Sequence, residues 1–135
     1  MAVFLPVAAV LAGLCLSGGG TQRFISADRF ELGWMHSIEK TNWNEFWRVV
    51  NNELVLDWAS VQTSGAGMDI PENAVFRDGA YYYRVDRNLS ELRLFQVSSP
   101  FGYRLCVNSS CKSIESWLGL SSLEGEILVK PCLKP

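Results

Sequence analysis

Apolar and polar residues alternate along Arg29 to Ile38, and this alternation constrains the fold more than any other feature of the chain. Successive side chains of a β-strand point to opposite faces, so a period of two indicates a strand with one buried face. Similar short stretches recur down the chain between turn signals, and little of the 3.6-residue period of helices is present. The pattern predicts antiparallel β structure. The residues on the apolar face of this first stretch are Phe30, Leu32, Trp34, His36 and Ile38.

Two neighbouring asparagines predict a tight hairpin between residues 45–50 and 53–61. Asparagine tolerates the positive φ angles that a two-residue turn needs, so the turn is placed at residues 51–52. On one face of the hairpin, Arg48 lies diagonal to Asp57 and predicts an exposed ion pair worth well under about 1 kcal/mol. The other face is apolar and ends in a carboxylate. Its expected cross-strand pairs are Val49 with Leu54, Trp47 with Leu56 and Glu45 with Trp58.

A second hairpin is indicated by Asp78-Gly79, between residues 74–77 and 80–85. Residues 113–123 can hold one helical turn. A chain of 135 residues supports one domain. We therefore expect an all-β fold, a single small antiparallel β-sandwich or partly open barrel of about seven or eight strands. The remaining strands are expected at 92–97, 103–107 and 127–132.

The first 22 residues, 1–22, contain no Asp, Glu, Lys or Arg. Their apolar run, residues 2–16, would span roughly 22 Å as a helix, short of the roughly 30 Å hydrocarbon core. This length predicts a secretory signal peptide cleaved near residues 17–20, or a short N-terminal membrane anchor. Lipidation at Cys15 fits poorly because a bulky leucine precedes it. We expect residues 23–135 to form the single β domain behind this leader.

Removal of the leader would leave three cysteines, Cys106, Cys111 and Cys132. In an oxidising compartment this number predicts one disulfide and one spare thiol. A bridge from Cys132 to Cys106 or Cys111 is favoured, since it would tie the last strand to a hairpin. A local Cys106–Cys111 bridge is the alternative. A zinc site would need all three thiolates together with His36, and the spacing is not that of a zinc finger, so no metal is expected.

Polar residues gather around the only histidine, His36, where the first strand ends. Ser37 is its neighbour in sequence and would point to the opposite face, so a Ser–His catalytic pair is not expected. His36 fits a buried imidazole at the end of the sheet, a contact to a ligand, or a general acid or base. Glu39, Lys40 and Glu45 fit either a solvated strand end or a charged rim around the imidazole.

A loop of small residues, 64–68, provides a second candidate site. Its backbone N–H groups could cradle an anion, but it lacks the lysine and the following helix of a phosphate-binding loop. A tight crossover that needs flexible φ angles is the alternative. The candidate residues of this loop are Ser64, Gly65, Gly67 and Met68.

The two segments together resemble an uncharacterised bacterial domain family. The resemblance is carried by Trp34-x-His36-Ser37-Ile38-Glu39-Lys40-Thr41-x-Trp43-x-Glu45, Ser64-Gly65-Ala66-Gly67-Met68 and Arg77-Asp78-Gly79, with the hairpin and terminal cysteines. Genes of that family commonly lie beside those of TAXI-type tripartite ATP-independent periplasmic (TRAP) transporters. Asn42 departs from the family pattern, which has proline there. The resemblance implies periplasmic localisation and an association with solute uptake, and it brings no catalytic residues because the family has no established activity.

These observations predict a non-enzymatic periplasmic accessory of a TAXI-type TRAP transporter, with or without a tether to the inner membrane. It would contact the substrate-binding protein or the membrane subunit. One alternative is a stand-alone periplasmic binder of a small carboxylate solute, which would use Lys40 and the 64–68 loop. A less favoured one is a hydrolase or isomerase built on His36 and Glu39. A net charge of −2 without a basic patch argues against nucleic acid, and no cofactor is expected. The interaction candidates are His36, Ser37, Glu39, Lys40, Trp43, Glu45, Ser64, Gly65, Gly67 and Met68.

Overall fold

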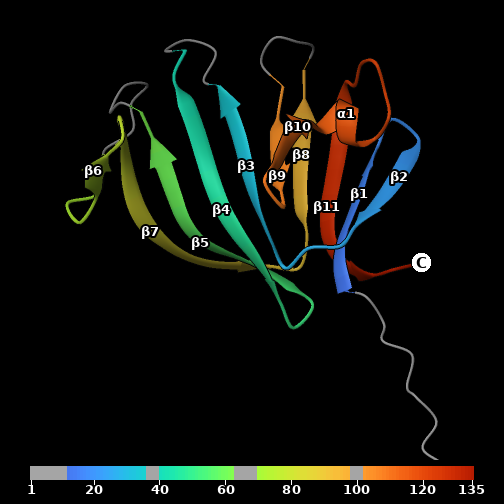
Figure 1. The fold of residues 1–135 in the computed structure, drawn as a ribbon, viewed down its shortest axis with the longest axis horizontal. Helices are drawn as coiled ribbons and strands as arrows, with labels where there is room; N and C mark the ends of the chain where they lie inside the picture. The colour runs from blue at the N-terminus through green and yellow to red at the C-terminus, as the bar shows by residue number, and fades with distance from the viewer. Residues whose placement is uncertain (1–11, 36–39, 63–69, 98–101) are drawn as a thin grey trace, which may run out of the picture.

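Eleven strands and one short helix make up the part of the chain that the computed structural model describes, residues 12–35, 40–62, 70–97 and 102–135 (Figure 1). The strands form two antiparallel sheets, which confirms the expected all-β, sandwich-like fold. The smaller sheet has the order β2-β1-β11-β8. Its strands are β1 (Ala12–Gly18), β2 (Thr21–Ile25), β8 (Leu92–Gln96) and β11 (Gly125–Leu133).

The larger sheet has seven strands in the order β10-β9-β3-β4-β5-β7-β6. In Figure 1 its strands β5, β7 and β6 lie to the left of the smaller sheet and extend beyond it. The single helix, α1 (Ile114–Trp117), follows β10. The strands are β3 (Arg29–Met35), β4 (Asn42–Val50), β5 (Glu53–Val61), β6 (Val75–Arg77), β7 (Ala80–Leu89), β9 (Arg104–Val107) and β10 (Ser110–Ser113).

One hydrophobic core joins the two sheets. Alternation along each strand turns one set of side chains toward this core, and burying them supplies the main driving force for folding. The core residues that are fully inaccessible to solvent come from both sheets and from the helix: Leu14, Leu16, Leu32, Leu54, Leu105, Ile114, Ile127 and Val129.

Both predicted hairpin turns are confirmed by their backbone angles. Asn51 and Asn52 have φ values of 48° and 65°, and Asp78 and Gly79 have 51° and 82°. A two-residue turn with two positive φ angles matches the right-handed twist of the flanking strands. The helical turn expected within residues 113–123 is also present, as α1.

The β4–β5 register is confirmed near the turn and differs beyond it. Val49 faces Leu54 and Trp47 faces Leu56 as expected, but Glu45 faces Ala59 rather than Trp58. The cause is a bulge at Asp57, which adds one residue to β5 and shifts the register. The extra residue turns Trp58 to the outer face of the sheet, where 40% of its surface is exposed.

The ion pair expected between Arg48 and Asp57 is present at this bulge. Arg48 Nη2 donates to Asp57 Oδ1 at 3.0 Å, and Nε donates to the other carboxylate oxygen. The hydrogen bonds from Arg48 hold the pKa of Asp57 below its ordinary 3.8. Because the pair is exposed, its contribution to stability is small.

The folded domain of the structure begins earlier than the expected boundary between a leader and the β domain. β1, placed in the leader by the sequence, lies in the smaller sheet between β2 and β11. Leu14 and Leu16 are fully buried in the core. The folded domain therefore includes residues 12–22, and cleavage near residues 17–20 would remove β1. Residues 1–11 lie outside the described residues, and no helix among the described residues has the length and apolar character to cross a bilayer.

The disulfide pairing differs from the favoured expectation for the same reason. Cys132 is bonded to Cys15, with 5.7 Å between the two Cα atoms, and not to a hairpin cysteine. Cys106 is bonded to Cys111, which was the alternative pairing. Assigning Cys15 to a removable leader had left an odd number of cysteines. With Cys15 inside the sheet all four cysteines are paired, and none is left as a thiolate for zinc.

Candidate functional site

Strands β3 and β5 end, and β4 begins, at the same end of the seven-stranded sheet (Figure 1). The first motif joins β3 to β4, and the second follows the end of β5. Trp43 at the start of β4 pairs with Trp34 on one side and with Val61, the last residue of β5, on the other. The backbone N–H of Asn42 donates to Gln62 Oε1 at 2.7 Å. The stems of both motif segments are therefore adjacent.

The described residues include three of the interaction candidates, Lys40, Trp43 and Glu45. Lys40 is exposed and has a φ of 54° just before β4. Trp43 is half-buried within β4. Glu45 does not lie at the strand end, because β4 begins at Asn42, and its half-buried side chain does not form one exposed rim with Lys40. The candidates that lie outside the described residues are His36, Ser37, Glu39, Ser64, Gly65, Gly67 and Met68.

Aromatic residues surround Glu45 on the core-facing side of the seven-stranded sheet. We call Glu45 with Trp34, Trp43, Tyr83 and Tyr103 the Glu45 cluster. The ring centroid of Trp34 lies 6.1 Å from that of Trp43 and 5.9 Å from that of Tyr103. Tyr83 lies two strands from Glu45 in the same cross-strand row. The cluster lies just inside the end of the sheet from which both motif segments leave.

The electrostatics of the cluster depend on the burial of Glu45. Burial raises the pKa of Glu45 from 4.5, and the nearby Trp47 indole and Arg87 guanidinium offset this only in part. Burial, followed by the negative charge of Glu45, raises the pKa values of Tyr83 and Tyr103 from 10.0. The Glu45 carboxylate is therefore close enough to both tyrosines for its charge to act on each hydroxyl.

The raised pKa of Glu45 predicts a pH-dependent gain in stability for Glu45→Gln. The folded chain binds the Glu45 proton more tightly than the unfolded chain, so stability falls as pH rises from 4.5 through the raised folded value. Glutamine has no charge to desolvate. The variant should be more stable than the wild type at neutral pH, and this difference should shrink below pH 4.5.

Urea unfolding at a series of pH values measures this difference. Glu31→Gln is the matched control, because Glu31 lies on the neighbouring strand and pairs with Phe46 on the opposite face of the sheet. A Glu45→Gln variant that is less stable than the wild type at neutral pH would contradict the expectation.

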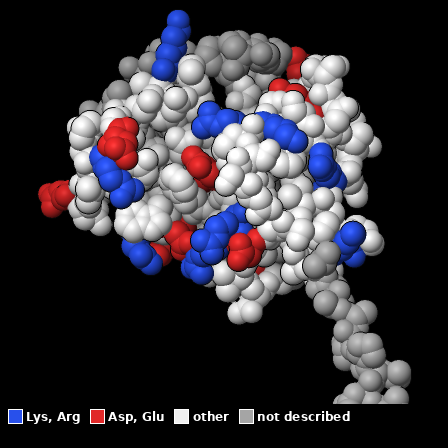
Figure 2. Space-filling view, viewed as in Figure 1, with Lys and Arg blue, Asp and Glu red and all other residues white. Residues whose placement is uncertain are grey.

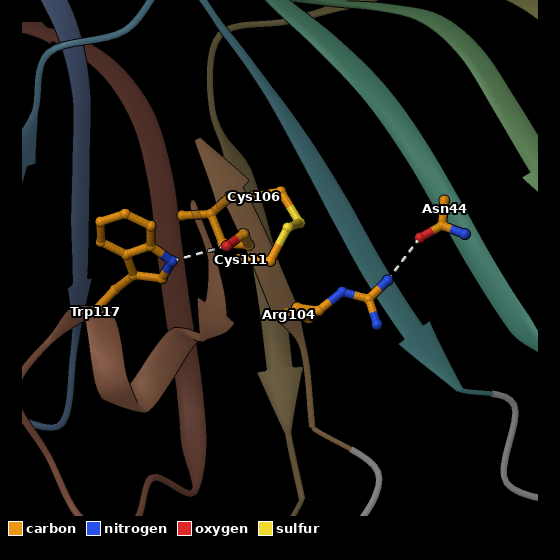
Figure 3. Close-up of a disulfide and its surroundings, with 6 residues drawn as sticks. Asn44, Arg104, Cys106, Cys111 and Trp117 are labelled. Atoms are coloured by element: carbon orange, nitrogen blue, oxygen red, sulfur yellow. Dashed lines mark hydrogen bonds between the residues drawn. A yellow bond between two sulfur atoms is a disulfide. The ribbon is translucent and has the colours of Figure 1, made fainter. Parts of the chain in front are cut away.

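A side-chain hydrogen bond and a disulfide lie on the outer face of the same sheet (Figure 3). Arg104 Nη2 on β9 donates to Asn44 Oδ1 on β4 at 3.0 Å, passing over Gly33 of the intervening β3. A Cβ atom on Gly33 would lie 2.6 Å from Arg104 Nη2, so glycine leaves the space for this contact. The Cys106–Cys111 disulfide lies further along β9 and β10.

A broad open depression of about 790 Å³ lies on the same outer face. Its charged residues are of both signs, three acidic and two basic, and Arg48 and Asp57 among them already bond to each other. Figure 2 likewise shows Lys and Arg interspersed with Asp and Glu on the side toward the viewer. No three His, Cys, Asp or Glu residues among those described come together as a metal site would require.

The tyrosines of the Glu45 cluster were missed by the sequence analysis. The sequence pattern indicates strands at 80–85 and 103–107, so both aromatic residues are expected in or next to strands. Their convergence depends on β7 pairing with β5 and on β9 pairing with β3, which are strands distant in sequence. The alternation within β7 was the only signal available, and it does not reveal strand order.

Comparison with known proteins gives one match. The model of a family described as "Domain of unknown function (DUF1850)" matches residues 30–114, from β3 to the first residue of α1. This range contains both motif segments and all of the Glu45 cluster. No curated protein and no solved structure is significantly similar to the chain. Because the match covers more than half of the sequence, the chain belongs to the DUF1850 family, a domain of unknown function.

Proposed function

We propose that this protein acts in the periplasm as a non-enzymatic accessory of a TAXI-type TRAP transporter. The two disulfides carry the first part of the proposal. Disulfides persist in oxidising, exported compartments and are rare in the cytosol. The proposal that the partner is the transporter rests on the two motif segments, which resemble a family whose genes commonly lie beside those of TAXI-type TRAP transporters. Genes that lie together suggest that their products act together.

The surface proposed for contact is the end of the seven-stranded sheet where the motif segments emerge. Lys40 is exposed there, and so is Met35 at the end of β3, with 38% of its surface accessible. An exposed cation and an exposed apolar side chain at one end of a sheet suit a polar-rimmed protein contact. The partner would be the substrate-binding protein or the membrane subunit.

Co-purification from membranes of the native host tests the proposal. The tagged full chain should recover transporter subunits, and Lys40→Glu should weaken that recovery because it reverses a charge at the contact. Lys134→Glu is the matched control, since Lys134 is also exposed but lies in the C-terminal tail. Recovery of the protein alone, with solute uptake unchanged on its deletion, would contradict the accessory role.

The two alternatives stay predictions and have their own tests. A binder of small carboxylates should show thermal stabilisation in a screen of organic acids, by about 2.7 kcal/mol at 100 times the dissociation constant. A hydrolase or isomerase should lose a pH-dependent activity in His36→Ala with the fold intact. No contact of the described residues favours either over the accessory role.

A further inference from the structure

The Glu45 cluster combines a half-buried carboxylate with aromatic rings on three neighbouring segments of the sheet. Trp34 on β3 is near both Trp43 on β4 and Tyr103 beside β9, with ring centroids 6.1 Å and 5.9 Å away. Tyr83 on β7 lies on the other side of Glu45, two strands away across Ala59. Glu45 itself lies between Leu32 and Ala59, two buried apolar residues, in the cross-strand row. Apolar and aromatic surface therefore encloses one negative charge.

The polar groups of this region are incompletely paired. Among the described residues, Glu45 forms no ion pair. Its one hydrogen-bonding neighbour is the indole N–H of Trp47, two residues along the same strand, which lowers the pKa of Glu45 but is too poorly aligned to form a full hydrogen bond. Buried charges in native proteins are normally paired with an opposite charge, so a half-buried carboxylate whose one hydrogen-bonding neighbour is a neutral indole calls for an explanation.

An organic cation has the chemistry that this cluster lacks. Ammonium groups are attracted to the faces of Trp and Tyr rings and form charge-assisted contacts with carboxylates. The larger sheet extends past the smaller one (Figure 1). We propose that the Glu45 cluster binds the ammonium group of a small organic cation, either a primary amine or a quaternary ammonium.

The charges around the cluster favour a cation over an anion. The charged or titratable groups known to act on Glu45, or to respond to it, are Arg87, Tyr83 and Tyr103. Arg87 is exposed and forms no ion pair with Glu45, so its effect on the carboxylate is that of a nearby charge and not of a bonded partner. The negative charge of Glu45 would repel an anion. The inference concerns a ligand of this chain alone and goes beyond the accessory role, because it needs no partner protein.

Titration of the full chain with tetramethylammonium and butylammonium tests the proposal. Binding is measured by calorimetry and by the NMR signals of the Trp34 and Trp43 indole N–H groups, which report on the cluster itself. Glu45→Gln should weaken binding at least tenfold, since it removes the charge without changing the shape of the side chain. Glu31→Gln, on the opposite face of the sheet, should bind like the wild type.

Measuring the affinity for the cation at decreasing pH provides a second test. Tetramethylammonium keeps its charge at every pH, so its affinity should fall as Glu45 becomes protonated, and binding at acidic pH should release protons. Tyr83 and Tyr103 titrate far above this range. Equal affinity of the wild type and Glu45→Gln would overturn the proposal. Preference for butyrate over butylammonium, or no binding of either cation to the folded chain, would also overturn it.

Discussion

Replacement of both Cys15 and Cys132 by serine should lower the free energy of unfolding far more than replacement of both Cys106 and Cys111. The first bond joins residues 117 apart in sequence, and the second joins residues 5 apart. In the chain-entropy model a loop of roughly 100 residues gives about 4.7 kcal/mol, whereas a 15-residue loop gives about 3 kcal/mol and a shorter one less. Loss of the long-range bond should therefore remove a large part of a small domain's stability.

Urea unfolding of the two double variants, compared with the wild type under oxidising conditions, measures this difference. The hairpin variant is the matched control because it also replaces two cysteines in a sheet. Both disulfides join strands that already pair through backbone hydrogen bonds, so the two variants differ mainly in the length of the loop that the lost bond had closed. A hairpin variant destabilised as much as the Cys15 and Cys132 variant would show that loop entropy does not set the contribution of these bonds.

The sequence predicted local structure well because local structure depends on nearby residues. The positive φ angles at Asn51, Asn52 and Asp78 follow from residue type, and the alternation before them marks the strands. The bulge at Asp57 was not predicted. No residue type near it indicates a bulge. Its effect is to move Trp58 to the outer face and to bring Ala59 opposite Glu45. A shift of one residue thus decided which side chains share the core face.

The difference between sequence and structure at the N-terminus arises because short apolar runs are ambiguous. A stretch such as Ala12 to Gly18 has the composition of the end of a signal peptide and of a strand buried on both sides. Cys15 distinguishes a strand from a signal peptide here, because assigning it to a leader leaves three cysteines and therefore one unpaired. The strand order, which brings β1 beside β11, could not be predicted from the alternation of residues within each strand.

The candidate site was predicted in part for the same physical reason. Glu45 and Trp43 were identified because they lie in one motif, and the structure places both in the cluster. Tyr83 lies in β7 and Tyr103 directly precedes β9. These strands pair with partners distant in sequence, so only the sheet brings the two tyrosines to Glu45. Burial of the carboxylate, which raises its pKa, is likewise a property of the assembled sheet.

Removal of β1 should abolish the fold. A chain that begins at Thr21, as cleavage after Gly20 would produce, lacks the strand that joins β2 to β11. It also loses Leu14 and Leu16, both fully buried, and the Cys15 bond. Truncation of one buried leucine to alanine costs about 2–5 kcal/mol, and the bond adds up to about 4.7 kcal/mol. Their combined loss is comparable to the roughly 5–15 kcal/mol that stabilises a typical domain.

A chain that begins at Ala12 is the matched control, because it keeps every described strand. It should show a cooperative urea transition and the near-ultraviolet circular dichroism of ordered aromatic side chains, and the chain that begins at Thr21 should show neither. Intact mass of the protein from its native host then gives the corresponding test in the cell. Any cleavage compatible with the fold leaves Leu14 and Cys15 in place, because the smaller sheet is held together through them. A mature chain that starts at residues 17–20 and still unfolds cooperatively would show that β1 is dispensable.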